Sequence, residues 1–166
     1  MRYDKLILSD CDLSNNFFRK EFWPFSSHTT SIEVLNGSGF NVKELLTTFQ
    51  NVERLGISGT SVNLTCLTDI LSFNHRLSGL IFIFPKESSN CFTADQLFAF
   101  LKAQKPGFSL TIECYRGQND EFLELRQALT QRFKTTWLKY FREPDLKFNL
   151  KGEPGYYIKQ TTFYLY

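Results

Sequence analysis

The sequence has few of the residues that bind metals, and it lacks long apolar runs. It contains 4 Cys and 2 His, and no two cysteines have the Cys-x-x-Cys spacing that is typical of zinc sites. We therefore expect no metal and no other cofactor. No apolar stretch approaches the roughly 20 residues that a membrane helix needs, so we expect no membrane partner.

A secretion signal is also missing from the first residues of the sequence. Residues 1–5 (Met-Arg-Tyr-Asp-Lys) are polar, whereas a signal peptide opens with a longer apolar stretch. We expect an intracellular protein, in the cytoplasm or the nucleus, whose thiols stay reduced and behave as small apolar core residues.

Charge of one sign is not in excess, since 19 Lys and Arg face 17 Asp and Glu. A nucleic-acid binder usually has a far larger basic surplus. The densest basic stretch lies among aromatic residues that could stack on bases, but an exposed basic rim beside packed aromatic residues explains it more simply. That stretch comprises Arg132, Lys134, Lys139 and Arg142. We expect no nucleic-acid partner.

Apolar residues are plentiful, and they recur in a repeat. The 42% of hydrophobic residues and the 18 Phe indicate a folded globular chain of one domain, residues 1–166. Residues 3–13 fit the leucine-rich pattern L-x-x-L-x-L-x-x-C-x-L with Tyr3 in the first apolar position, and residues 52–62 fit it with Thr60 at the turn position. Three poorer copies stand at the places expected for further repeats. The equivalent positions are Leu6, Ile32, Leu55, Leu80 and Leu110. They follow one another at steps of 26, 23, 25 and 30 residues, close to the length of about 20–29 residues that leucine-rich repeats have.

Each repeat strand is followed by a segment with apolar residues at helical spacing. Two of these segments open with a capping signal, Asn41 with an acid at Glu44, and Thr93 with Gln96. The expected apolar stripes are Leu45, Leu46 and Phe49; Leu64, Leu67, Ile70, Leu71 and Phe73; Leu97, Phe98, Phe100 and Leu101; and Phe122, Leu125, Leu129 and Phe133 in a helix from Asn119. A shorter helix is expected over residues 15–22.

These elements predict an α/β fold. A lone strand–helix unit cannot cover its own apolar face, so neighbouring units stack and share one core. We expect residues 1–134 to form a short leucine-rich-repeat-like solenoid, with parallel strands on one side and helices on the other. Residues 135–166 alternate in polarity on both sides of a Gly-Glu-Pro-Gly turn at residues 152–155, which predicts an antiparallel C-terminal cap.

Alternate strand residues would then lie on a concave surface that can bind a partner protein. An apolar track flanked by opposite charges suits docking, because contiguous exposed apolar area usually marks an interface. The alternative is that Ile81 and Ile83 belong to the core, since residues 80–84 are all apolar. The predicted partner-binding residues are Ile7, Ser9, Glu33, Leu35, Arg54, Ser58, Ile81, Ile83, Glu113 and Tyr115.

Catalytic residues are not indicated. His28 follows two serines, but Ser-Ser-His lacks the strand–turn–helix setting of a nucleophile elbow. His75, within Phe-Asn-His-Arg, is typical of a solvated loop histidine. A catalytic base also needs an orienting partner and a pocket, so we expect no enzyme activity.

Three segments resemble one known family. They are residues 69–74 (Asp-Ile-Leu-Ser-Phe-Asn) with Leu80 and Ile81, residues 97–104 (Leu-Phe-Ala-Phe-Leu-Lys-Ala-Gln), and residues 149–152 (Asn-Leu-Lys-Gly). Over residues 52–166 the chain resembles the F-box-associated domain (type 2) of nematode F-box proteins. Phe98 stands where that family prefers Asn, and Gln104 where it prefers Trp.

The resemblance implies a role in target recognition by cullin–RING ubiquitin ligases. In that family an F-box recruits the ligase, and the associated domain is thought to bind the protein to be ubiquitinated. No F-box precedes the first expected strand, so we expect either a fragment or truncated paralogue of such a protein, or a target binder that acts as a decoy. The alternative is a leucine-rich scaffold that binds a partner protein and has no ubiquitin connection.

Overall fold

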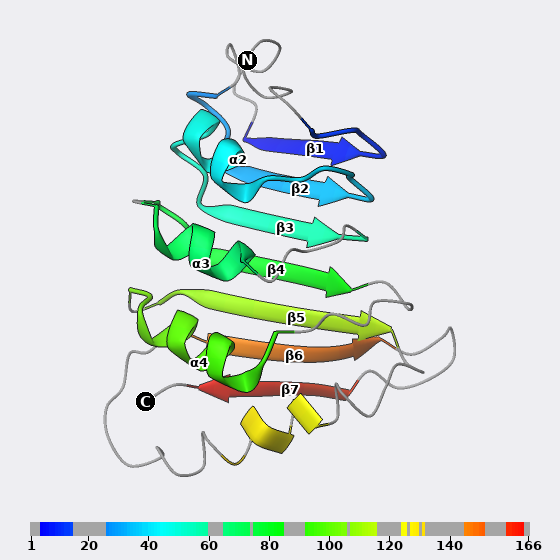
Figure 1. Cartoon of the computed structure of the whole chain (residues 1–166), viewed down its shortest axis with the longest axis vertical. Helices are drawn as coiled ribbons and strands as arrows, with labels where there is room; N and C mark the ends of the chain where they lie inside the picture. Colours follow the sequence, from blue (N-terminus) through cyan, green and yellow to red (C-terminus); the bar gives the residue numbers. More distant parts are fainter. Residues whose placement is uncertain are drawn as a thin grey trace.

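One sheet organises the molecule. The computed structural model describes residues 4–14, 26–59, 65–73, 75–84, 92–105, 107–115, 124, 125, 127–129, 131, 145–151 and 159–164. Within these residues the strands lie side by side in chain order (Figure 1), as β1 (Lys5–Ser9), β2 (Ser31–Leu35), β3 (Arg54–Ser58), β4 (Gly79–Phe84), β5 (Ser109–Tyr115), β6 (Asp145–Lys151) and β7 (Lys159–Tyr164). Neighbouring strands from β1 to β6 are parallel. The predicted mixed α/β class is confirmed.

The strand register follows the sequence repeat. Leu6 pairs with Ile32, Ile32 with Leu55, Leu55 with Leu80, and Leu80 with Leu110. The predicted equivalence of these five positions is therefore confirmed. Because a slip of one residue would turn every side chain to the opposite face, this register decides which residues are buried.

The three described helices of the repeats are α2 (Val42–Thr48), α3 (Cys66–Leu71) and α4 (Ala94–Lys102). Asn41 caps α2, since its side-chain oxygen accepts from the backbone N–H groups of Lys43 and Glu44. Thr93 and Gln96 form the predicted capping box of α4. These caps satisfy N–H groups that a helix start leaves without partners.

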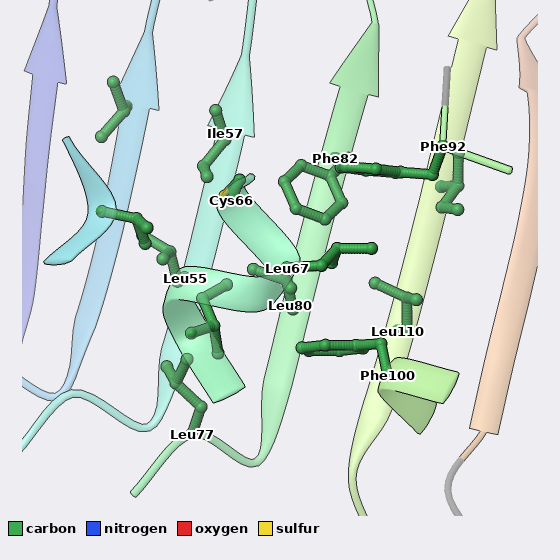
Figure 2. Packing of buried hydrophobic residues seen from close by; sticks show 14 of the residues in the cluster. Leu55, Ile57, Cys66, Leu67, Leu77, Leu80, Phe82, Phe92, Phe100 and Leu110 are labelled. Atoms are coloured by element: carbon green, nitrogen blue, oxygen red, sulfur yellow. The ribbon is translucent and has the colours of Figure 1, made fainter. Parts of the chain in front are cut away.

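The helices cover one face of the sheet, and the core lies between them and the strands (Figures 1 and 2). Because successive side chains of a strand point to opposite faces, every second strand residue points into this core and the others point away from it. Figure 2 shows side chains of β3, β4 and β5 meeting those of α3 and α4, with exposed fractions of 3% or less for Leu55, Ile57, Leu80, Phe82, Leu110, Cys66, Leu67 and Phe100.

Three residues with a left-handed backbone end β1, β2 and β3. Asp10, Asn36 and Gly59 have φ angles of 53°, 51° and 65°. Each donates its backbone N–H to the next strand, to the carbonyls of Leu35, Ser58 and Ile83 respectively. The Asn36 side-chain amide also donates to Oδ1 of Asp10 at 3.1 Å. A hydrogen bond from the Ser9 hydroxyl, followed by this one from Asn36, holds the pKa of Asp10 below its usual value.

A substitution of Gly59 tests how much the left-handed turn after β3 and its contact with Asn36 contribute to stability. We expect Gly59→Ala to lower the free energy of unfolding by about 2 kcal/mol, because a side chain is strained at this φ and its Cβ would overlap Oδ1 of Asn36. Gly107→Ala is the matched control, since Gly107 has a φ of +86° but no atom within 4 Å of the added Cβ. Urea denaturation of both variants gives the comparison. Equal losses would show that the Asn36 contact contributes nothing.

The carboxyl-terminal strands join the same sheet. β6 pairs in parallel with β5, with Leu146 beside Leu110, and β7 pairs antiparallel with β6. The sequence pattern did not predict the pairing of β6 with β5. The turn expected at residues 152–155 lies outside the described residues, as does the helix expected over residues 15–22.

Other expectations about apolar residues hold in part. Of the helix expected from Asn119, Leu125 and Leu129 are buried, whereas Asn119, Phe122 and Phe133 lie outside the described residues. Leu64 also lies outside them. The expectation that Leu71 is buried is wrong: it is 39% exposed, because Cys66, Leu67 and Ile70 form the buried side of α3.

Among the cysteines, Cys66 packs in the core as expected. It is free, and burial, followed by the charge of Asp69, raises the pKa of its thiol to about 12. Cys11 is also free and partly buried. Cys91 and the side chain of Cys114 lie outside the described part. No described helix is long and apolar enough to cross a membrane.

Candidate functional site

The sheet face opposite the helices is the candidate site, and we call it the open face. No helix that the structure describes lies on it (Figure 1). The register arranges its residues from β1 to β5 in three rows. The first row is Lys5, Ser31, Arg54, Gly79 and Ser109; the middle row is Ile7, Glu33, Gly56, Ile81 and Thr111; the last row is Ser9, Leu35, Ser58, Ile83 and Glu113.

The predicted binding residues belong to these rows. Ile7, Glu33 and Ile81 share the middle row, and Arg54 lies in the first. The last row contains Ser9, Leu35, Ser58, Ile83 and Glu113. Tyr115 lies two residues beyond Glu113 in β5, and its side chain is outside the described part. The structure thus brings nine of the ten predicted residues onto one face.

The register of β4 decides between the two interpretations of its apolar run. Leu80, Phe82 and Phe84 are 3% exposed or less, whereas Ile81 is 40% exposed. Ile83 is half-buried on the same face as Ile81. The interpretation that places Ile81 in the core is wrong, because its neighbours on both sides occupy the core positions.

Two large apolar side chains stand out on the open face. Ile7 in β1 is 52% exposed and Ile81 in β4 is 40% exposed. Both lie in the middle row, with Glu33 and Gly56 between them. Exposed leucine and isoleucine side chains are common singly, and these two, three strands apart in one row, offer a partner two separate apolar contact points on the same face.

The charges of this face are only partly paired. Nζ of Lys5 lies 2.8 Å from Oε1 of Glu33, so these two charges neutralise each other at the β1–β2 side. Arg54 is exposed and forms no ion pair with any residue that the structure describes. Within the described rows from β1 to β5, Arg54 is therefore a cation without an ion pair.

Sequence reasoning missed the small residues of the face. Gly56 lies beside Ile81, and Gly79 beside Arg54. A Cβ added to Gly56 would come within 3.3 Å of Cγ of Glu33, and one added to Gly79 within 3.9 Å of Cγ of Arg54. The long side chains thus lie along the positions that have none. The repeat register was the signal that could have located both glycines.

The two histidines and Asp12 lie outside the strands that form the open face. His28 is exposed, and Nδ1 of His75 accepts a hydrogen bond from the backbone N–H of Leu77 at 3.2 Å. Hydrogen bonds from Ser14 hold the pKa of Asp12 below its usual value. The described residues contain no group of three or more side chains placed to hold a metal ion.

Comparison with family models, curated proteins and solved structures gives no match. The open face therefore has to be interpreted from its own geometry and chemistry.

His75 gives the fold a dependence on pH. Burial, followed by the positive charge of Lys105, lowers the pKa of this imidazole below 6.5. The unfolded chain then binds more protons, so His75 stabilises the fold fully above about pH 6.5, and this contribution is lost as the pH falls through the lowered pKa. We expect the free energy of unfolding to fall over that range.

The variant His75→Asn tests this dependence. An asparagine oxygen can replace Nδ1 as the acceptor for Leu77 but cannot titrate, so the corresponding part of the pH dependence should disappear. Denaturation curves at several pH values give the slopes, and identical slopes for the parent and His75→Asn would refute the assignment.

Proposed function

We propose that this chain is a non-catalytic protein-interaction domain that binds a partner protein on its open face. The observation that carries the proposal is the placement of Ile7 and Ile81 in one row of a face that no described helix covers. Removal of such apolar area from water favours association by roughly 25 cal/mol per Å² before the costs of association are subtracted.

We further propose that the parallel strand–helix units form a leucine-rich-repeat-like solenoid and that β6 and β7 act as its C-terminal cap. Three features support this: the strands follow chain order, the helices share one face, and the repeat positions lie in register. In repeat proteins the units share a core with their neighbours, and a terminal element must shield its end.

The link to ubiquitin ligases is a proposal that rests on the resemblance to the F-box-associated domain. Of the segments that carry it, residues 97–102 lie in α4 and Leu80 and Ile81 in β4. Both a target-binding domain of a ligase and a general scaffold would bind the partner protein on the open face. They differ in what accompanies the bound protein.

A pull-down tests the docking proposal. The parent chain, Ile81→Asp and Leu71→Asp are each used to capture proteins from lysate of the source cells. Leu71 is the matched control because it is 39% exposed, as Ile81 is 40%, but lies in α3 on the helical side. We expect a partner that the parent and Leu71→Asp retain and Ile81→Asp loses. A partner lost equally with both variants would contradict docking on the open face.

The same capture separates the two functional candidates. Cullin–RING subunits retained together with the partner would support the ubiquitin-ligase proposal. A partner retained without them would favour the general scaffold.

A further inference from the structure

Arg54 is a positively charged residue on the open face whose neighbours do not neutralise it. Its row neighbours are Ser31 in β2 and Gly79 in β4, and neither can neutralise a guanidinium group. The nearest acidic residue of the middle row is Glu33, which is already paired with Lys5 at 2.8 Å. A partner that covers Arg54 without supplying a negative charge would bury a cation unpaired, which is costly.

On the β4 side, the open-face neighbours of Arg54 carry no charge. Gly79 lies beside it in the first row, and Ile81 follows Gly79 by two residues on the same face of β4. With strands about 4.8 Å apart and alternate residues about 7 Å apart along a strand, Arg54 and Ile81 lie roughly 8 Å apart diagonally. Gly56 and Gly79 carry no side chains of their own, and the side chains of Glu33 and Arg54 lie beside these two positions.

We propose that the partner binds through an extended acidic segment, which places a carboxylate on Arg54 and a bulky apolar side chain on Ile81. In an extended chain, side chains two residues apart point the same way and lie about 7 Å apart, close to the separation of the two contact points. The planar guanidinium group can bind a carboxylate through two parallel hydrogen bonds. This inference rests on the proposed docking function and specifies the partner chemistry.

Nucleic acid is a poorer match for the same face. Its binding depends on several cations that contact successive phosphates, whereas Arg54 is the one cation without an ion pair in the described rows from β1 to β5, and the next lysines of the register, Lys147 and Lys151, lie on β6, three strands away. An acidic peptide needs only that one, and its apolar residues also use Ile81.

A selection from a library of short random peptides tests the inference. The intact chain is the target, and peptides that also bind Ile81→Asp are removed. We expect the enriched peptides to carry Asp or Glu two residues from a bulky apolar residue. Arg54→Glu should weaken their affinity by about tenfold or more, whereas Arg76→Glu, at an exposed arginine between α3 and β4, should leave it unchanged.

Charge reversal on both sides is the sharpest comparison. Replacing the peptide acid by Lys should weaken binding to the parent chain and restore binding to Arg54→Glu. Peptides that depend on Ile81 but respond equally to Arg54→Glu and Arg76→Glu would overturn the acidic segment and leave the docking function intact. Enriched peptides that prefer basic residues would overturn it as well. If no peptide distinguishes the parent from Ile81→Asp, both the inference and the docking function are wrong.

Discussion

Replacement of Phe82 by alanine is expected to lower the free energy of unfolding by about 4 kcal/mol, because it removes a large aromatic side chain from the core. Phe82 is fully buried at the centre of the sheet. Its ring centroid lies 5.0 Å from that of Phe92 and 6.1 Å from that of Phe84. Truncation would remove these contacts and leave a cavity that the strands on both sides cannot fill. Urea denaturation measures the loss.

Ile81→Ala is the matched control for Phe82→Ala. It changes the adjacent residue of β4, which points to the opposite face and is 40% exposed, and we expect a loss below about 1 kcal/mol. If Phe82→Ala fails to fold, Phe82→Leu gives a smaller loss that can be measured. Similar losses at positions 81 and 82 would contradict the assignment of these two residues to opposite faces.

Ile81→Asp is expected to weaken binding of the captured partner by about 30-fold, equivalent to about 2 kcal/mol. The substitution replaces apolar contact area by a carboxylate that the bound partner would bury. It also places a negative charge near Arg54, which would then attract a ligand carboxylate less strongly. Titration calorimetry with the purified partner gives the dissociation constants.

Leu71→Asp introduces the same charge at nearly the same exposure on the helical side. Its affinity should remain within about twofold of the parent value. Thermal unfolding of both variants checks that each is folded, because exposed substitutions usually change stability by about 0.5 kcal/mol or less. A Leu71→Asp variant that binds as weakly as Ile81→Asp would move the interface to the helices.

The register between the repeat strands could be predicted because it follows from the spacing of the apolar residues. Leu6, Ile32, Leu55, Leu80 and Leu110 recur at nearly constant steps, and a parallel repeat buries the equivalent residue in each unit. Helix starts could be predicted at Asn41 and Thr93, since the local sequence supplies both partners of each cap. The open face then follows from alternation along the strands.

The turns at the strand ends could not be recognised in the same way. Asp10, Asn36 and Gly59 occupy one structural position with three different residue types. Each tolerates a left-handed backbone for its own reason, Gly through its missing Cβ and Asp and Asn through local hydrogen bonds. A pattern based on residue identity therefore misses their equivalence.

The pairing of β6 with β5, unlike the antiparallel pairing of β6 with β7, could not be predicted from the sequence. Alternation at Leu146, Phe148 and Leu150 indicates a strand, but the same alternation serves parallel and antiparallel neighbours. The pairing of β6 with β5 depends on how the intervening chain returns to the sheet. On the open face, Gly56 and Gly79 were overlooked because side-chain chemistry gives no reason to select a residue without one.

Covalent footprinting of the chain with and without its captured partner tests the open face most directly. A carbene probe labels exposed side chains, and mass spectrometry locates the protected sites. The docking account predicts strong protection at Ile7 and Ile81, with Leu71 labelled as in the free chain. Protection at Leu71 with Ile7 and Ile81 still labelled would place the partner on the helices and contradict the account.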